Sequence, residues 1–426
     1  MSRLLYNAAL AALMPVAFPY LEWRARRQAG LGDAWRQRLG WVEDRPAGDG
    51  PIWVHAASVG EVQAALPLLR ALDNAMPDRR LVVTTFTAAG ARRLAESAGD
   101  RVICLTLPYD LPGPVNRFLD RVRPAALLVT ETELWPNLFH AVHARGIPLM
   151  LGSARLSERA FRRYQRLSGL LAETVSRIDL IAAQSDGDAE RFRALGAATE
   201  CVETMGNVKF DLHASSSVAE RGTGLRRSLF GDRPVWIAGS TRQGEDEQIL
   251  DAFEQVRQDH GDAVLVLAPR HPERGAALRQ LVKARGLVSA QRSAEQSADG
   301  VDVYIVDTLG ELMTFYAAAD VAFVGGSLVP VGGHNLLEPV ALGVPVLTGP
   351  YHDNAMDVAE LLMGAGAVRR VGGADELAAR VSELLADGEA RARQAAAGWK
   401  VIEANRGAVD RLVTRLARLM GEELLT

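Results

Sequence analysis

The sequence is poor in cysteine. Its 426 residues include only Cys104 and Cys201, which match no metal-binding or redox spacing and are too few for a disulfide framework. An excess of one charge is also missing, because 48 Lys and Arg stand against 52 Asp and Glu, so nucleic acid is not the expected main partner. The scarcity of cysteine favours a reducing compartment, which means the cytosol or a surface that faces it.

Neither disorder nor a fibrous repeat fits the composition. Hydrophobic residues make up 48% and charged residues 23% of the chain, and both values are near those of globular proteins. The 426 residues are too many for one ordinary core. At about 150 residues per domain, the length predicts two or three domains.

An uncharged hydrophobic run stands near the amino terminus, over residues 4–21. As a helix it would be roughly 27 Å long, which is close to a bilayer core of about 30 Å. The arginines that follow this run are Arg24, Arg26, Arg27, Arg36 and Arg38. Because such a flank keeps the following chain on the cytoplasmic side, we expect a membrane anchor over residues 1–24. A helix lying in the membrane interface and a buried amino-terminal helix are the alternatives.

After this run, short apolar segments alternate with stretches of helical length. The apolar segments are 52–56, 81–86, 102–106, 125–130, 147–151 and 178–183, then 235–240, 263–269, 302–307, 320–326 and 344–349. Continuously apolar strands that alternate with helices are typical of parallel sheets covered on both faces. A Ser- and Gly-rich linker over 211–224 interrupts the pattern. We therefore predict an α/β chain with two doubly wound Rossmann-like domains facing a cleft, over residues 25–212 and 222–426.

Ligands of such sheets bind at the loops that follow the strands, and the first loop is HAASVGE (55–61). Gly60 permits a tight backbone, and Glu61 falls in the first turn of the next helix. The positive end of the helix favours an ionised carboxylate and lowers its pKa, which suits a general base. Ser58 followed by a glutamate three residues later is also a plain capping box, and the spacing alone leaves both interpretations open.

Two further loops of the first half carry polar candidates. TETELWPN (130–137) places Glu131 and Glu133 beside Trp135, an arrangement that suits a sugar, although Pro136 equally indicates a helix start. In SARLSER (153–159), Arg155 is a candidate for contact with an anionic substrate, and an ordinary helix start is the alternative.

Two loops of the second half suit a phosphate. APRHPER (268–274) offers cationic groups before a helix, and a solvated loop is its alternative. GGSLVPVGGHNLLEP (325–339) is more specific, because its glycines let backbone N–H groups approach a phosphate closely. In this interpretation His334 neutralises the leaving charge and Glu338 accepts from a ribose. His140 and His143 have helical spacing but no evident third ligand, so no metal site is predicted.

These loops together closely resemble the bacterial 3-deoxy-D-manno-octulosonic acid (Kdo) transferases of lipopolysaccharide synthesis. The matching blocks are HAASVGE, TTFTAAG (84–90), LPYDLPG (107–113), ETELWPN, SARLSER, GNVKFD (206–211), GSTRQGED (239–246), APRHPER and GGHNLLEP. The resemblance implies a GT-B glycosyltransferase with its active site between the domains. It also implies transfer of Kdo from CMP-Kdo to the lipid A precursor (lipid IVA) at the cytoplasmic face of the inner membrane.

The resemblance further implies roles for single residues. Glu61 matches the proposed catalytic base of the family, and Glu131 matches an acidic residue near the acceptor, where we also place Arg155. The candidate donor-binding residues are Lys209, Ser240, Thr241, Arg270, His271, Gly332, Gly333, His334, Asn335 and Glu338. The implied reaction is inverting and uses no metal or other cofactor. Its partners are CMP-Kdo, the lipid acceptor and inner-membrane lipid.

Two stretches depart from the family pattern. Residues 350–358 read PYHDNAMDV, where an aromatic residue often follows the asparagine, and Arg242 follows Thr241 where histidine is common. Two other functions stay open on the sequence. One is a membrane-surface GT-B transferase with another nucleotide sugar, and the other is a noncatalytic protein that binds a nucleotide sugar.

Overall fold

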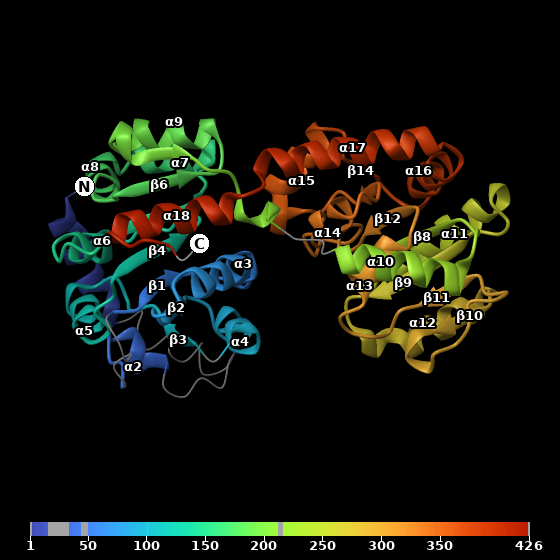
Figure 1. The fold of residues 1–426 in the computed structure, drawn as a ribbon, viewed down its shortest axis with the longest axis horizontal. Helices are drawn as coiled ribbons and strands as arrows, with labels where there is room; N and C mark the ends of the chain where they lie inside the picture. The colour runs from blue at the N-terminus through green and yellow to red at the C-terminus, as the bar shows by residue number, and fades with distance from the viewer. Residues whose placement is uncertain (1, 16–33, 44–49, 100, 212–215, 425–426) are drawn as a thin grey trace. The chain divides into compact units, whose positions relative to one another are not determined.

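The computed structural model describes residues 2–15, 34–43, 50–99, 101–211 and 216–424. The chain forms two compact units (Figure 1). Unit 1 comprises Met1–Asp211 with Asn405–Thr426, and unit 2 comprises Leu212–Ala404. Each unit contains a parallel seven-stranded sheet, which confirms the predicted α/β class and the two doubly wound domains. The predicted cleft between the domains stays a prediction.

The sheet of unit 1 has the strand order β3-β2-β1-β4-β5-β6-β7. Its strands are β1 Ile52–His55, β2 Leu81–Thr85, β3 Val102–Thr106, β4 Ala126–Thr130, β5 Leu149–Ala154, β6 Leu180–Ala183 and β7 Val202–Thr204. The six strands that the apolar segments predict are all present. Their order makes β1 and β4 the centre of the sheet, where both faces are covered and every residue is buried.

The sheet of unit 2 has the strand order β10-β11-β9-β8-β12-β13-β14. Its strands are β8 Val235–Thr241, β9 Val264–Pro269, β10 Ser289–Gln291, β11 Val303–Ile305, β12 Val321–Val324, β13 Val346–Thr348 and β14 Val368–Arg370. Three strands, β7, β10 and β14, were not predicted from the sequence. Each of these strands has three residues, lies at a sheet edge and includes polar side chains, so none gives an apolar run.

Helices cover both faces of each sheet. In unit 1 they are residues 3–15, α2 Ala34–Arg38, α3 Val59–Ala75, α4 Ala88–Ser97, α5 Pro112–Val122, α6 Pro136–His143, α7 Glu158–Gln165, α8 Ser168–Val175, α9 Asp186–Leu195 and α18 Ala408–Met420, with the short turns η1 Thr199–Cys201 and η2 Val208–Phe210. In unit 2 they are α10 Ser216–Leu225, α11 Asp246–Asp259, α12 Gly275–Ala284, α13 Leu312–Ala317, α14 Leu337–Ala341, α15 Met356–Gly364, α16 Ala374–Ala386 and α17 Gly388–Asn405, with η3 Arg226–Phe230, η4 Pro272–Arg274, η5 Arg292–Ala294 and η6 Asp353–Ala355.

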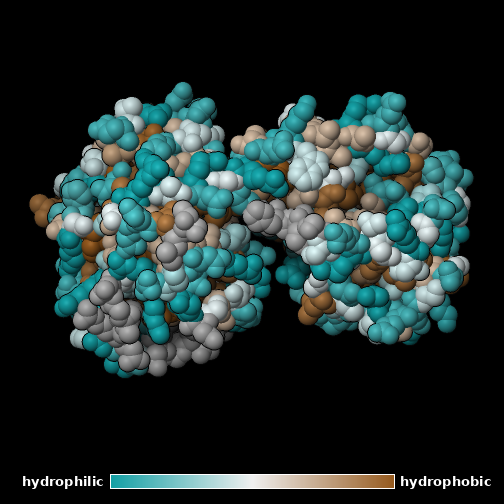
Figure 2. All heavy atoms as spheres, in the orientation of Figure 1, coloured by the Kyte–Doolittle hydropathy of each residue, from teal (hydrophilic) through white to brown (hydrophobic). Residues whose placement is uncertain are grey.

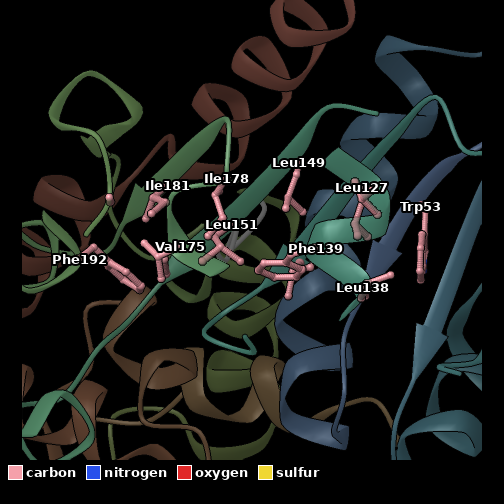
Figure 3. Close-up of a cluster of buried hydrophobic side chains, with 14 of the residues drawn as sticks. Trp53, Leu127, Leu138, Phe139, Leu149, Leu151, Val175, Ile178, Ile181 and Phe192 are labelled. Atoms are coloured by element: carbon pink, nitrogen blue, oxygen red, sulfur yellow. The ribbon is translucent and has the colours of Figure 1, made fainter. Parts of the chain in front are cut away.

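The core of unit 1 has two layers, because successive strand residues point to opposite faces of the sheet. On β4, Leu127 joins the cluster drawn in Figure 3, together with Phe139 of α6 and Phe192 of α9. The next residue, Leu128, packs on the other face with residues of α3 and α18. Hydrophilic residues dominate the visible face of both units in Figure 2. Burial of each large apolar side chain contributes about 1.5–3 kcal/mol to folding.

The carboxyl-terminal helix belongs to unit 1, although the prediction assigned residues 222–426 to the second domain. Figure 1 shows α18, in red, lying on the sheet of unit 1. Leu412 and Leu416 of α18 are buried in the core layer that contains α3. The carboxylate of Asp211 accepts the backbone N–H groups of Gly407 and Val409, at 2.6 Å each, and so fixes the start of the helix. The chain therefore enters unit 2 and returns.

The predicted linker is also shorter than expected, because Ser216–Leu225 forms α10. This helix packs against α13 of unit 2. Gly222 permits the close approach, since a Cβ atom there would lie 2.4 Å from Cβ of Ala317. Gly222, which lies in the predicted linker, is thus a packing residue.

The first helix is docked on unit 1 by polar contacts. The Tyr6 hydroxyl donates to Asp110 at 2.9 Å, and Asn7 accepts from the Asn137 side chain at 2.6 Å. Within the residues that the structure describes, no helix is long and apolar enough to cross a membrane. This observation concerns only part of the predicted anchor over residues 1–24, because residues 16–24 lie outside the described residues. The anchor stays a prediction.

Some of the arginines that follow the predicted anchor are described by the structure and others are not. Arg24, Arg26 and Arg27 lie outside the described residues. Arg38 donates to the carbonyl oxygen of Phe86 at 2.6 Å, and its guanidinium lies 4.7 Å from the Phe86 ring centroid. Arg38 therefore stabilises unit 1 internally.

Candidate active site

Glu61 lies in the first turn of α3, directly after β1. Its Oε2 accepts the N–H of Ala57 at 2.8 Å, and the Ser58 hydroxyl donates to its Oε1 at 3.0 Å. The Glu61 N–H donates in return to the Ser58 hydroxyl at 3.3 Å. The Ser58 hydroxyl caps the helix as in the capping box that the spacing allowed, but the Glu61 carboxylate accepts the N–H of Ala57 instead of that of Ser58. These bonds also hold the carboxylate at the carboxyl edge of the sheet.

The surroundings of Glu61 reverse the expected direction of its pKa. Burial raises the pKa of Glu61, the hydrogen bond from Ala57 lowers it, and the charges of Glu131 and Glu133 raise it further. The net direction is upward, so the expectation that the helix end depresses this pKa is wrong. The sequence reveals the helix end, but not the desolvation and the two carboxylates that the fold brings close.

A chain of hydrogen bonds holds Glu133. Its Oε2 lies 2.7 Å from His55 Nε2 and accepts the indole N–H of Trp135 at 3.1 Å. His55 Nδ1 lies 2.9 Å from the Thr84 hydroxyl, which accepts the indole N–H of Trp53 at 2.9 Å. His55, Thr84 and Trp53 are fully buried. These hydrogen bonds therefore connect buried residues of the core to the carboxylate of Glu133 at the sheet edge.

Glu131 has an uncommon backbone conformation and a cationic partner. Its φ of 58° lies in the left-handed region, where strained non-glycine residues cluster at functional sites. Its Oε1 forms an ion pair with Nζ of Lys209, in η2, at 2.8 Å. Lys209 thus lies in unit 1 beside a candidate acceptor residue, although the resemblance implied a place near the donor.

Arg155 is tied to the loop that carries Glu131. The Arg155 N–H donates to the Thr132 hydroxyl at 2.9 Å, and that hydroxyl donates to the Arg155 carbonyl oxygen. Ser153, near the end of β5, has a φ of 54°. The carboxyl ends of β1, β4 and β5 therefore bring together the four candidate residues of unit 1, which are Glu61, Glu131, Arg155 and Lys209.

In unit 2, a fully buried carboxylate ties two loops together. Oε1 of Glu245 accepts the N–H groups of Ser327 and Leu328, each at 2.8 Å. Oε2 accepts the N–H groups of Gly326 at 2.6 Å and Arg242 at 2.8 Å. This cage joins the loop after β8 to the loop after β12. Glu245 was not among the predicted site residues, and its only signal in the sequence is its place after the second glycine of GSTRQGED.

The candidates Ser240 and Thr241 end β8. Ser240 has a φ of 58°. The buried Thr241 hydroxyl donates to Asp246 at 3.0 Å, and Asp246 also pairs with Arg274. Arg274 reaches the carbonyl oxygen of Thr241 at 3.2 Å. Asp246 and Arg274 were also missed, and they stabilise the turn that presents Ser240.

His334 lies among cationic side chains. Arg242 Nε donates to its Nε2 at 3.2 Å, and Arg242 Nη1 lies 2.8 Å from His271 Nε2. Burial, together with the charges of Arg242 and Arg270, lowers the pKa of His334 to about 4. The imidazole is therefore uncharged near pH 7 in these surroundings, and its role in neutralising a leaving charge stays a prediction. The positive charge at this edge comes from the arginines.

The glycine pair before His334 has the backbone that its motif requires. Gly332 and Gly333 have φ values of 96° and 75°, and a Cβ atom on Gly332 would lie 2.7 Å from the Asn354 side chain. The Asn335 amide donates to Glu338 Oε1 at 3.2 Å. Burial raises the pKa of Glu338. The candidate donor residues other than Lys209 thus gather at the carboxyl ends of β8, β9 and β12.

Comparisons with known proteins match both units. Residues 33–212 match the family model described as 3-deoxy-D-manno-octulosonic-acid transferase (kdotransferase), and residues 245–401 match the model for glycosyl transferases group 1. A 3-deoxy-D-manno-octulosonic acid transferase of Haemophilus influenzae is 41% identical over 367 residues, which are 86% of each chain. One of Bordetella pertussis is 36% identical over an alignment of 433 positions, which covers 99% of this chain and 100% of its own.

A solved structure shares the fold across both units. The UDP-GlcNAc 2-epimerase of Neisseria meningitidis, bound to UDP-GlcNAc, aligns with a TM-score of 0.56. The alignment covers 86% of this chain and 100% of the epimerase, at 14% sequence identity. At this identity the likeness concerns the architecture alone.

Proposed function

Since the chain belongs to the 3-deoxy-D-manno-octulosonic acid (Kdo) transferase family, it is a GT-B glycosyltransferase that transfers Kdo, and we propose CMP-Kdo as donor and the lipid A precursor as acceptor. The observation that carries the mechanism is the carboxylate cluster at the edge of unit 1. Glu61 is held there beside Glu131 and Glu133, and its proton affinity is raised. A sugar acceptor needs this chemistry, because its hydroxyl must lose a proton as it attacks.

In the proposed reaction, Glu61 accepts the proton of the acceptor hydroxyl while that oxygen attacks the anomeric carbon of Kdo. The bond from this carbon to the CMP phosphate oxygen breaks, and CMP leaves with inversion at the carbon. A carboxylate with a raised pKa is a better general base once it is ionised, because its pKa lies closer to the pH at which the enzyme works. The hydrogen bonds from Ala57 and Ser58 support this role, because they fix the carboxylate before substrate arrives.

The charge that develops on CMP needs fixed positive groups in unit 2. We assign this task to Arg270 and to the backbone N–H groups of the Gly332–Asn335 loop. Arg242 adds a further positive charge beside His334. Because the protein supplies these positive groups itself, we propose a reaction that is independent of a metal. Lys209, paired with Glu131, acts on the acceptor side in this proposal.

The first helix supports a place at the cytoplasmic face of the inner membrane. Its polar contacts through Tyr6 and Asn7 leave Leu4, Leu5 and Leu13 exposed, by 81%, 61% and 61%. A docked helix with exposed leucines suits the interface between headgroups and acyl chains. We therefore propose that residues 3–15 lie along the membrane surface.

Helix α7 offers a basic surface on the same unit. Phe161 and Tyr164 pack one face of α7 against the core. Four exposed arginines follow the spacing i, i+3, i+4 and i+7, which places them on one face. They are Arg159, Arg162, Arg163 and Arg166, and they line a hollow of about 740 Å³. Such a surface suits anionic lipid headgroups.

The proposal is tested with detergent-solubilised protein, CMP-Kdo and the tetraacylated lipid A precursor. CMP release and the mass of the lipid are followed together. We expect both to increase in step, and the mass gives the number of Kdo units added. A parallel flotation assay compares vesicles with and without anionic lipid, and we expect stronger binding to the anionic vesicles.

Other outcomes would contradict defined parts of the proposal. CMP release without a gain in lipid mass would exclude this acceptor. Donor binding without CMP release would favour a noncatalytic protein. Equal flotation with both vesicle types would remove the headgroup role of α7.

A further inference from the structure

We propose that His55 is a positioning residue for the transfer reaction, which from its buried place on β1 holds the Glu133 carboxylate beside Glu61. The inference rests on the proposed role of Glu61 and extends it to a residue that the reaction itself does not touch. Glu133 side chain is 27% exposed, whereas His55 is not exposed at all. The hydrogen bond therefore links the solvent-accessible carboxylate of Glu133 to the buried ring of His55.

The proton positions follow from the donors along the chain. The Trp53 indole can only donate, so the Thr84 hydroxyl accepts from it and is free to donate its own proton to His55 Nδ1. His55 Nε2 then carries the ring proton and donates to Glu133 Oε2. Nδ1 also lies 3.0 Å from the Thr84 carbonyl oxygen, and the ring contacts Glu133 Oε2 through Nε2 in either case. In both arrangements the bond fixes the position of Oε2.

The second oxygen of Glu133 is left for substrate. His55 and Trp135 both contact Oε2, and among the described residues no hydrogen bond to Oε1 is found. A carboxylate held through one oxygen presents the other in a fixed direction, which suits a hydroxyl of the acceptor. Loss of His55 would let this oxygen move.

The charge of Glu133 also acts on Glu61. Burial is the largest cause of the raised pKa of Glu61, and the charges of Glu131 and Glu133 add to it. The other charged or titratable groups on the neighbouring loops are Lys209, which pairs with Glu131, His55 itself, and Arg155 after β5. A protonated or displaced Glu133 would therefore lower the proton affinity of the base.

The test compares His55→Leu, His55→Gln and Glu133→Gln in the full-length enzyme. We expect His55→Leu to lower kcat by about 10- to 100-fold, because the carboxylate at the reacting centre loses its fixed position. His55→Gln should recover most of this loss, since its amide N–H reaches the place of Nε2. In Glu133→Gln, the acid limb of the kcat profile should move to lower pH, because Glu61 loses a neighbouring negative charge.

Thr174→Val is the matched control. Thr174 is fully buried in unit 1, and its hydroxyl bonds to the Leu170 carbonyl oxygen, away from the site. This variant should lose a buried hydrogen bond without a change in the pH profile. Thermal unfolding and CMP binding show whether each variant is folded.

The outcomes separate this inference from the proposed function. Wild-type protein without turnover would overturn the function itself. An active wild type with a folded His55→Leu variant of unchanged kcat would overturn the role of His55. If His55→Leu does not fold, Glu133→Gln decides, and an unmoved acid limb overturns the inference.

Discussion

The two units place a glutamate at the same topological position and use it differently. Glu61 follows β1, which lies between β2 and β4, and Glu245 follows β8, which lies between β9 and β12. Each comes directly after a glycine, Gly60 or Gly244, where the helix after the strand begins. Glu61 accepts one backbone N–H and one hydroxyl and remains partly exposed. Glu245 accepts four backbone N–H groups and is fully buried.

The difference shows what makes a carboxylate available for chemistry. Four donors occupy the acceptor sites of Glu245, so it has little capacity left for a substrate proton, and its contribution is to hold two loops. Glu61 keeps spare acceptor capacity and has other carboxylates nearby, which raise its proton affinity. Partial satisfaction and like charge, rather than the motif, therefore distinguish the proposed base Glu61 from the structural residue Glu245.

The largest expected effect comes from Glu61→Gln. We expect turnover to fall by about 10²- to 10⁴-fold, because the variant has no base for the acceptor proton. CMP binding and the thermal midpoint should stay near those of the wild type, since the amide can still accept a hydrogen bond from Ala57 or Ser58. Release of CMP measures the first effect. Near-normal turnover with intact donor binding would reject Glu61 as the base.

Glu245→Ala should give the opposite pattern. Removal of the carboxylate leaves four backbone N–H groups without their acceptor, and we expect the free energy of unfolding of unit 2 to fall by about 3 kcal/mol or more. CMP affinity should fall with it, because the loops after β8 and β12 separate. Urea denaturation followed through unit 2 measures the loss. A stable variant with normal CMP affinity would show that the cage is dispensable.

The smallest effect is expected for His334→Asn, which tests whether a group in unit 2 makes the stability of the protein depend on pH. The pKa of His334 is lowered to about 4 in the folded protein, from 6.5. Folding therefore stabilises the neutral ring, and this stability is present above the unfolded pKa and is lost as the pH falls toward 4. The variant should lose less stability than the wild type between pH 7 and pH 4.5. Thermal midpoints at both pH values test this, and identical acid sensitivity would contradict it.

Much of the fold could be predicted from the sequence because central parallel strands are apolar on both faces. The runs around Leu127 and Val266 need no tertiary information to be recognised. Three of the four edge strands, such as Val202–Thr204, carry no such signal, since they are only three residues long and include polar side chains. The fate of the last helix was unpredictable for another reason, because an amphipathic pattern shows that a helix packs but not which sheet it packs on.

The site was predictable as a set of loops and not as an electrostatic arrangement. The rule that ligands bind beyond strand ends located the loops of Glu61, Glu131 and Arg270. The role of Glu245 could not be predicted, because three of its four partners are backbone N–H groups about 80 residues away. Backbone groups leave no pattern of side chains in the sequence. The pKa directions of Glu61 and His334 depend on burial and on neighbours from several loops, which spacing does not contain.

The return of α18 to unit 1 sets the order in which the protein can mature on the ribosome. Leu412 and Leu416 complete a core layer whose other members lie on strands and helices of the first half. All of unit 2 is translated before these residues emerge, and at about 5–20 residues per second this takes roughly ten seconds or more. During that interval the face of the first sheet that α3 and α18 share lacks α18, whereas unit 2 has its whole sequence by the time that α18 is translated. We therefore expect unit 2 to finish folding first, although the ribosome makes it second.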